Sequence, residues 1–416
     1  MSTVAIIAEF NPFHNGHKYL FDEAKRVTGA DNLVVVMSGD FVQRGAPAIT
    51  DKRNRTLFAL EMGADAVFEL PARYATASAP FFARAAVRLI ENLGICDYLC
   101  FGSETGKLLK LQEYIEMEKE NPDVFVENHL GSNDILGIEY IKAIEKRQSL
   151  IPVSIKRIEG DEIYTASLIR GRLLENFEDS VTEENNIFIY KDNKFWNSFP
   201  ELVANRIFEN QREFMCSEDM ISDILYERIL YYIYKYEGGC EDENNTKAAS
   251  KSIASEGLSK YCDVSEQLAN RIVSNIDKYE NFRQFAMLLK TKNYTYTRVC
   301  RALLHIALEI EKSEDELLGE YSPEVLIQVS YARLLGAKSS STNLLKEIKI
   351  PIVNKLGVAL KNEDGKLSSK QLSLLKEDVR VSELYRVLAK RNYGISFPSE
   401  FSTPAIIVGV SPLSSS

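Results

Sequence analysis

The stretch that decides the fold is Glu9-Phe10-Asn11-Pro12-Phe13-His14-Asn15-Gly16-His17. It follows a continuous apolar run at residues 4–8, which is typical of a buried strand. It leads into residues 18–27, where the apolar residues have helical spacing. This order places the turn at the N-terminus of a helix, where unpaired backbone N–H groups and a partial positive charge attract anions. The sequence therefore predicts a phosphate-binding turn at residues 14–17.

The residue types in this turn suit chemistry at phosphorus. Gly16 lets the backbone approach a phosphate closely. The imidazoles of His14 and His17 can donate to phosphate oxygens, and they can carry a proton while negative charge develops at the α-phosphorus. Attack on an α-phosphate by a bound carboxylate or phosphate requires positioning and charge stabilisation more than covalent help. The competing interpretation is that two of the four histidines share a turn by chance.

Outward from this turn, short apolar runs alternate with helical patterns as far as about residue 175. Strands are expected at residues 4–8, 33–37, 66–70, 98–101 and 151–158, and helices at 18–27, 51–62, 79–93 and from 165. This order predicts an α/β fold, with a Rossmann-like domain at residues 1–175 whose parallel sheet has helices on both faces. Ligands bind beyond the carboxyl ends of such strands, where the loops at 14–17, 38–44 and 102–104 lie.

From about residue 201 the pattern becomes helical. We expect helices at residues 224–236, 266–275, 285–289, 297–311, 323–335 and 382–390. We therefore assign residues 176–416 to a second, mainly α-helical region.

Composition and charge limit the class of protein. The chain has 45% hydrophobic and 26% charged residues, as soluble globular proteins do. It has no run of ~20 apolar residues that could span a bilayer, and its first residues lack the features of a signal peptide, so we expect a cytosolic protein. The six cysteines form no C-x-x-C pair and are expected to be free thiols without a metal. The net charge of −10 argues against coating nucleic acid non-specifically, but it allows a local basic face.

The pattern His14-x-Gly16-His17 resembles the nucleotidyltransferase superfamily, which includes cytidylyl- and adenylyltransferases and class I aminoacyl-tRNA synthetases. The second signature of that superfamily is a hydroxyl-rich helix start late in the domain. That place is occupied by Thr165-Ala166-Ser167-Leu168-Ile169-Arg170. Hydroxyls and N–H groups at a helix start bind phosphate, and Arg170 can neutralise a leaving pyrophosphate. The alternative is an ordinary helix cap followed by a solvated arginine.

Several segments resemble one family in particular, the tRNA(Met) cytidine acetate ligases. Besides the stretch at residues 9–17, they are Met37-Ser38-Gly39-Asp40-Phe41-Val42-Gln43-Arg44-Gly45-Ala46-Pro47, Gly63-Ala64-Asp65-Ala66-Val67-Phe68-Glu69-Leu70-Pro71, Cys100-Phe101-Gly102-Ser103-Glu104 and Ser132-Asn133-Asp134-Ile135-Leu136-Gly137. The resemblance runs over most of the chain and is densest before residue 175. It implies that acetate is activated with ATP to acetyl-adenylate. The acetyl group would then pass to N4 of the wobble cytidine of elongator tRNA(Met), giving N4-acetylcytidine.

The resemblance also implies a set of ATP contacts. It places them at Ile7, Ala8, Glu9, Phe10, Asn11, Pro12, Phe13, His14, Asn15, Gly16, His17, Lys18, Tyr19 and Leu20, and at Gly102, Asn133 and Arg157. Gly102 would give a close backbone approach at a strand end, Asn133 an acceptor and donors for adenine or ribose, and Arg157 a cation at the same rim. Without the family, each would be interpreted as a turn glycine, a turn asparagine or a surface arginine. The family's late Ser-Ala-Thr element stands here as Thr165-Ala166-Ser167, which keeps both hydroxyls.

The loop after the second expected strand carries Asp40, Gln43, Arg44 and Lys52. Our hypothesis is that this loop helps to hold the acyl or cytidine end of the site, with Arg44 required for acetyl transfer. The alternative is a solvated charged loop in which Arg44 forms a salt bridge.

A basic segment in the helical region is the candidate tRNA surface. Arg298, Arg301 and His305 fall at helical spacing on one face, and Lys290 and Lys292 precede them. Tyr294 and Tyr296 are interleaved with these cations, and aromatic rings stack on unpaired bases. We assign tRNA contact to Lys290, Lys292, Arg298 and Arg301, against the alternative of a solvated basic face.

Two other functions compete with the acetate ligase. One is a nucleotidyltransferase acting on a small phosphate ester or cofactor precursor, although the large helical half argues against it. The other is a non-catalytic RNA-binding or assembly protein, against which the intact histidine turn argues. Mg²⁺ is expected because it usually bridges the phosphates of ATP. Acetate as the carboxylate and elongator tRNA(Met) as the acceptor come from the family resemblance alone, and the oligomeric state cannot be derived from the sequence.

Overall fold

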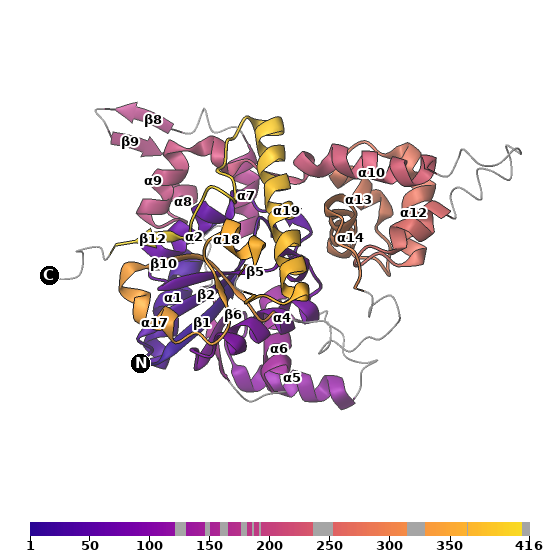
Figure 1. Ribbon diagram of the computed structural model, residues 1–416. Helices are drawn as coiled ribbons and strands as arrows, with labels where there is room; N and C mark the ends of the chain where they lie inside the picture. Colours follow the sequence, from indigo (N-terminus) through magenta and orange to yellow (C-terminus); the bar gives the residue numbers. More distant parts are fainter. Residues whose placement is uncertain are drawn as a thin grey trace, which may run out of the picture.

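The computed structural model describes residues 1–120, 130–145, 150–158, 165–175, 181–184, 187–190, 193–235, 253–313, 329–363 and 365–409. An eight-stranded sheet lies at its centre, in the order β11-β10-β5-β2-β1-β6-β7, with β12 pairing β10 (Figure 1). The strands are β1 (Thr3–Ala8), β2 (Asn32–Ser38), β5 (Ala66–Leu70), β6 (Tyr98–Ser103), β7 (Ile151–Lys156), β10 (Ala332–Lys338), β11 (Ile352–Val353) and β12 (Ile406–Val408).

The five strands from the first part of the chain are parallel and confirm the Rossmann-like prediction. β1 lies in the middle, β2 and β5 extend the sheet to one side, and β6 and β7 extend it to the other. The strand order therefore reverses between β1 and β6. In doubly wound sheets ligands bind at the carboxyl ends of the strands at this reversal point. The turn at residues 14–17 leaves β1 at that position.

Helices cover both faces of the sheet (Figure 1). The relevant ones are α1 (Asn15–Thr28), α2 (Lys52–Glu61), α4 (Ala79–Leu93), α5 (Leu108–Glu120), α6 (Ser132–Glu145) and α7 (Ala166–Leu174). One apolar core joins Phe21, Phe58 and Ile169 to one face of the sheet, and a second joins α4, α5 and α6 to the other. Burial of both faces explains why the strands consist of continuous apolar runs.

The sheet receives three strands from beyond residue 175, which the expected domain boundary did not include. β10 runs antiparallel to β5, and β11 and β12 pair with β10. The helix expected at residues 323–335 is wrong at its end, because Ala332–Lys338 is a strand. Residues 323–328 lie outside the described residues. Six of the seven β10 residues are buried, so neither face shows the alternation that would mark a strand in the sequence.

The described residues after 175 that lie outside the sheet are largely helical, as predicted, apart from a hairpin of β8 (Val181–Glu184) and β9 (Ile187–Tyr190). α10 (Ser222–Tyr234), α12 (Glu266–Asn275), α13 (Phe282–Leu289) and α14 (Tyr296–Leu308) form a helical lobe beside the sheet, and α19 (Ser369–Tyr393) stands between the two (Figure 1). A single apolar core runs through the lobe and reaches Tyr385 and Leu388 of α19. In the part of the chain that the structure describes, no helix is long and apolar enough to cross a membrane.

A short hairpin joins the site edge of the sheet to the helical lobe. It consists of β3 (Phe41–Val42) and β4 (Ala46–Pro47), and Phe41 belongs to the core of the lobe. Gly45 at its turn has a φ of 77°, and a Cβ atom there would lie 2.4 Å from the backbone nitrogen of Arg301 in α14. Only glycine allows both this conformation and this approach. The hairpin therefore rests directly on the backbone of α14.

Candidate active site

The turn after β1 forms a capping box at the start of α1. Nδ1 of His14 accepts a hydrogen bond from the Gly16 backbone N–H at 3.0 Å, and Nδ1 of His17 accepts one from the His14 backbone N–H at 3.2 Å. The two imidazole rings lie 4.0 Å apart between centroids. A Cβ atom on Gly16 would come within 2.8 Å of the His14 ring, so a glycine is needed here to keep that ring in place.

This arrangement fixes which ring nitrogens carry the protons. Because each Nδ1 accepts a backbone hydrogen bond, each neutral ring has its proton on Nε2. Burial, with the positive charges of Arg157 and Arg170, lowers the pKa of His14 to about 4. Burial, followed by the influence of His14 and Arg157, lowers the pKa of His17 well below its ordinary value. At neutral pH both rings are therefore neutral Nε2–H donors.

The low pKa of His14 predicts a pH-dependent stability. Above about pH 6.5 the ring is neutral in both the folded and the unfolded chain. As the pH falls towards 4, the unfolded chain binds a proton that folded His14 excludes, so stability is lost in this interval. We expect wild type to lose about 2 kcal/mol more than His14→Asn between pH 7.5 and pH 5. Thermal melts of both proteins at the two pH values measure this, and parallel losses would contradict it.

Arg170 reaches this turn from α7. Its Nη1 donates to the Asn11 carbonyl at 2.7 Å, which ties α7 to the stretch after β1. Burial and the nearby Arg44 lower the pKa of Arg170, although Glu9 opposes the shift. Thr165 supplies the N-cap hydroxyl of α7, and Ser167, the second residue of that helix, is exposed. The N-terminus of α7 therefore lies beside the histidine turn, as the superfamily resemblance implied.

The strands on the other side of β1 contribute a second group. Arg157 follows β7, and its side chain passes Gly102 at the end of β6, where a Cβ atom would lie 3.5 Å from Cγ of Arg157. The Glu104 carboxylate accepts a hydrogen bond from Nδ2 of Asn133 at 2.6 Å and lies 3.6 Å from Nη1 of Arg157. The structure thus groups Gly102, Asn133 and Arg157 around Glu104. This group lies near the histidine turn, because the charge of Arg157 lowers the pKa of His14.

Within the stretch at residues 7–20, several other side chains pack against the histidine turn or anchor the start of α1. Phe10 and Phe13 are fully buried, and their rings lie 5.0 and 5.4 Å from the ring of His17. Nδ2 of Asn15 donates to the Asn197 carbonyl at 2.7 Å, and Lys18 forms an ion pair with Asp22 on α1. The backbone N–H groups of residues 14–17 are themselves engaged: those of His14 and Gly16 by the imidazoles, that of Asn15 by the Ser198 carbonyl and that of His17 by the His14 carbonyl. The groups of this turn left to bind an anion are therefore the Nε2–H groups of the two imidazoles.

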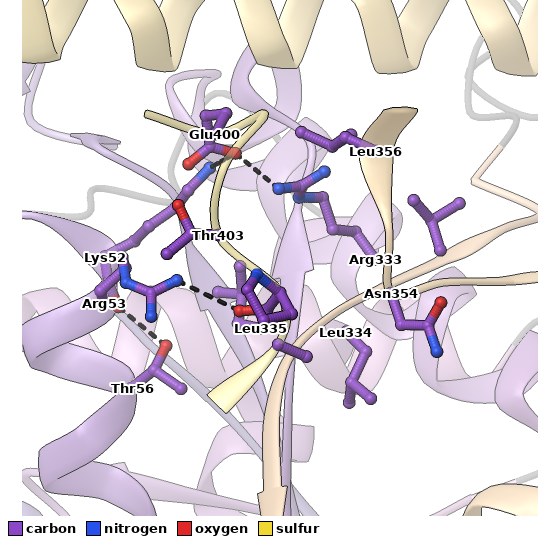
Figure 2. A pocket seen from close by; sticks show the side chains of 13 residues that line it. Lys52, Arg53, Thr56, Arg333, Leu334, Leu335, Asn354, Leu356, Glu400 and Thr403 are labelled. Atoms are coloured by element: carbon purple, nitrogen blue, oxygen red, sulfur yellow. Dashed lines mark hydrogen bonds and ion pairs between the residues drawn. The ribbon is translucent and has the colours of Figure 1, made fainter. Parts of the chain in front are cut away.

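The loop after β2 divides into two parts. The hypothesis that Asp40 and Lys52 help to hold the acyl or cytidine end of the site is wrong. Both are buried, and Nζ of Lys52 lies 2.8 Å from Glu69 and 3.0 Å from Glu400. Figure 2 shows Lys52 and Arg333 converging on Glu400 in a small pocket below the C-terminal segment. Lys52 therefore holds the sheet and this segment together and does not face a ligand. No local pattern indicates this arrangement, because Glu400 is distant along the chain.

Gln43 and Arg44 remain on the site side of that loop. The Gln43 backbone N–H donates to the Glu9 carboxylate at 2.9 Å. Arg44 is exposed, and its charge acts on Arg170. The hairpin therefore presents Arg44 between the histidine turn and the helical lobe.

Sequence reasoning missed Arg55, which is fully buried in α2. Its guanidinium donates to the carbonyls of Glu9 at 2.8 Å and Ser38 at 3.0 Å, and also to that of Gly39. Its Nε donates to the carbonyl of Thr50. One side chain thus ties the ends of β1 and β2 to the start of α2. The only signal in the sequence is a charged residue on a helix face that otherwise carries Phe58 and Ala59.

The basic segment of the helical lobe is only partly a free surface. Lys290, Lys292 and Arg298 are exposed, and the Arg298 guanidinium lies 4.9 Å from the ring centre of Tyr294. Arg301 is mostly buried, and its Nε lies 3.1 Å from Asp263 in an ion pair. His305 lies on the same side of α14 as Arg301, since both approach Asp263, but it is buried and bonds to Thr76 and to the Cys262 carbonyl. His305 therefore does not belong to the exposed basic surface. Its neighbours are polar and charged, because the charges of Asp263, Arg301 and Arg73 act on its ring besides the contact with Thr76.

Within the described ranges, no group of three or more His, Cys, Asp or Glu side chains could bind a metal ion. The described cysteines, which exclude Cys240, are all free thiols.

Comparisons with known proteins give a consistent result. The family model described as HIGH Nucleotidyl Transferase matches residues 1–131 and 126–396. The tRNA(Met) cytidine acetate ligase of Acetivibrio thermocellus is 34% identical over 439 residues, covering 95% of this chain and 98% of its own. The enzyme of that name from Clostridium perfringens is 32% identical over 463 residues, covering 98% of this chain and 100% of its own. The crystal structure of Thermotoga maritima TmcAL bound with alpha-thio ATP has the same fold, with a TM-score of 0.78 and 24% identity over 99% of this chain and 100% of that one.

Proposed function

Since the chain belongs to the tRNA(Met) cytidine acetate ligase family of HIGH nucleotidyltransferases, we propose that it activates acetate with ATP and acetylates N4 of the wobble cytidine of elongator tRNA(Met). The products are N4-acetylcytidine, AMP and diphosphate. The observation that carries the proposal is the pair of neutral Nε2–H donors, His14 and His17, at the start of α1 and at the reversal point of the sheet. This is an anion site built for a phosphate that gains charge during the reaction.

In the first step an acetate oxygen attacks the α-phosphorus of ATP, and the bond from this phosphorus to the diphosphate oxygen breaks. His14 and His17 donate to the α-phosphate oxygens, whose charge increases in the transition state. Arg170 and Arg157 flank the imidazoles and stabilise the diphosphate that leaves. The four residues supply position and charge, and no covalent enzyme intermediate is required.

In the second step N4 of cytidine attacks the acetyl carbonyl of acetyl-adenylate and gives up a proton to solvent. The bond from the acetyl carbon to the phosphate oxygen breaks, and AMP leaves. Arg44 stands on the hairpin between the ATP site and the helical lobe, close enough for its charge to act on Arg170. This place suits a residue that guides the RNA base to the adenylate. Mg²⁺ would arrive with the phosphates of ATP, because the described residues hold no cluster of three metal ligands.

Two measurements test the proposal. Pyrophosphate release from ATP should require acetate, and mass spectrometry of elongator tRNA(Met) incubated with labelled acetate should show a labelled acetyl group on the wobble nucleoside. Release that depends on a small phosphate ester instead would favour the alternative nucleotidyltransferase. No release with any carboxylate would contradict an enzymatic role.

The exposed basic face of the helical lobe should bind tRNA separately from ATP. Reversing two charges with Lys290→Glu and Arg298→Glu is expected to weaken tRNA binding at least tenfold and to lower the salt dependence of binding, while acetyl-adenylate formation stays unchanged. The matched control is Lys355→Glu with Lys361→Glu, two exposed lysines at α18 (Leu356–Lys361), outside the lobe. Filter binding and pyrophosphate release measure the two effects. Equal loss of both activities would argue against a separate RNA surface.

A further inference from the structure

The β3–β4 hairpin is fixed to the helical lobe at its base and at its turn. At the base, the ring of Phe41 lies 5.7 Å from that of Tyr385 in α19, and the Tyr385 hydroxyl donates to the Ala48 carbonyl at 2.8 Å. At the turn, a Cβ atom on Gly45 would overlap the backbone nitrogen of Arg301 and lie 2.9 Å from its Cα atom. These atoms belong to a helix backbone, which cannot move aside as a flexible side chain can. The backbone of α14 therefore sets the position of the hairpin turn.

On its other side, the same hairpin is fixed to the stretch that leads into the histidine turn. The Gln43 N–H donates to the Glu9 carboxylate at 2.9 Å, and the N–H of Ile49, just after the hairpin, donates to the Asn11 side-chain oxygen at 2.8 Å. The Asn11 carbonyl in turn accepts the hydrogen bond from Arg170. The hairpin thus connects the lobe to the loop that carries the phosphate-binding residues.

The helix under the hairpin turn also presents part of the basic face. Arg298 is exposed and lies one turn before Arg301 on α14. Arg301 is tied to the rest of the lobe, because its Nε pairs with Asp263 at 3.1 Å. The helix proposed to bind tRNA is therefore the helix on which the hairpin rests, and Arg44 immediately precedes the residue in contact.

We propose that Gly45 is a positioning residue for the acetyl-transfer step. Because it lets the hairpin rest on the backbone of α14, it sets the distance between RNA bound to the lobe and Arg44 beside the ATP site. The proposal rests on the proposed function, since it takes Arg44 to guide the cytidine to the adenylate. A misplacement of about 1 Å can slow a step by up to about 10²-fold. The residues assigned to the first step lie on α1, on α7 and after β7, so only the second step should depend on Gly45.

The test is Gly45→Ala, which places one methyl group against α14. Gly365→Ala is the matched control, since Gly365 has a φ of 61° but a Cβ atom there would meet nothing within 4 Å. Rapid-quench assays measure pyrophosphate release without tRNA and acetyl transfer at saturating tRNA. Gly45→Ala should slow transfer about 10- to 100-fold and leave pyrophosphate release and the Kd for tRNA within about threefold of wild type. Gly365→Ala should leave all three within about threefold.

A double variant shows whether Gly45 acts through Arg44. If it does, adding Gly45→Ala to Arg44→Ala should slow transfer by less than about a further twofold, because the side chain that Gly45 positions is already absent. Two losses that multiply would show that Gly45 acts on another group and would overturn the proposal.

The position of the hairpin can also be measured without turnover. Arg44 is exposed, and trypsin cleaves the bond between Arg44 and Gly45 once the hairpin opens. Limited digestion of the folded protein should cut this bond at least about tenfold faster in Gly45→Ala than in wild type or Gly365→Ala. If Gly45→Ala does not fold, Phe41→Leu keeps an apolar side chain in the lobe core and should show the same selective slowing of transfer.

Equal slowing of pyrophosphate release and transfer in Gly45→Ala would overturn the proposal, because a purely structural defect acts on both steps. Unchanged transfer, or a weaker affinity for tRNA that accounts for the whole loss, would overturn it as well. If wild type acetylates no tRNA, the proposed function fails, while tryptic cleavage still reports whether Gly45 holds the hairpin on α14.

Discussion

Replacing His14 by Asn is expected to lower kcat/KM for acetate-dependent pyrophosphate release by about 10²- to 10³-fold and to leave the fold intact. Asparagine is among the best N-cap residues, and its side-chain oxygen can replace Nδ1 as the acceptor for the Gly16 N–H. It carries no group at the position of the Nε2–H of His14. The variant therefore removes the donor to the α-phosphate and keeps the cap.

His14→Ala is the matched comparison, because it removes the donor and the cap together. It should lose a similar amount of activity and in addition about 1 kcal/mol of stability. Steady-state kinetics and thermal melts on the three proteins separate the two roles. If His14→Asn retained most of its activity, His14 would be a structural cap and His17 alone would have to stabilise the transition state.

The second large effect is expected on stability. Arg55→Met keeps much of the side-chain volume but leaves the carbonyls of Glu9, Ser38, Gly39 and Thr50 without their buried donor. Removing one partner from a buried charged network costs about 3–5 kcal/mol. For a protein of this size that corresponds to a fall in Tm of roughly 3–6 °C. ATP binding should weaken as well, because the ends of β1 and β2 frame the site.

Arg53→Met on the same helix is the control. The Arg53 side chain makes one hydrogen bond, from Nη1 to the Pro404 carbonyl at 3.2 Å near the surface. Its loss should change stability by less than about 1 kcal/mol. Melting temperatures of the two variants, measured side by side, give the comparison. Equal destabilisation would show that loss of positive charge from α2, and not the loss of the buried bonds, causes the effect.

The sequence predicted the parallel part of the sheet well, because each of its strands is a short apolar run followed by a helix of 3.6-residue period. β10 was missed for a physical reason. It is buried on both sides, so its sequence lacks alternation, and its partner β5 lies far away along the chain. Periodicity records the local environment of a segment, and it contains no information about a partner of this kind.

The same limit applies to the candidate site. His14, His17 and Arg170 could be found because their residue types and their places at helix starts are local signals. The burial of Lys52 and His305 depends on Glu400 and Thr76, which belong to other elements. Arg55 was missed because its partners are backbone carbonyls, and these are invisible in a sequence.

The antiparallel pairing of β10 with β5 has a consequence for biosynthesis. At ~5–20 residues per second, the ribosome needs roughly 10–50 s to proceed from β5 to β10. Throughout this time the nascent sheet has β5 as an unprotected edge, which could pair with the wrong chain. Glu69, the fourth residue of β5, puts a carboxylate on this edge, and its first partner Lys52 has already been synthesised. Arg333 and Glu400 then arrive last and complete the ion cluster when the edge is closed. A charged side chain on an exposed strand edge opposes pairing with another chain, and here the same carboxylate becomes part of the ion cluster when β10 closes the edge.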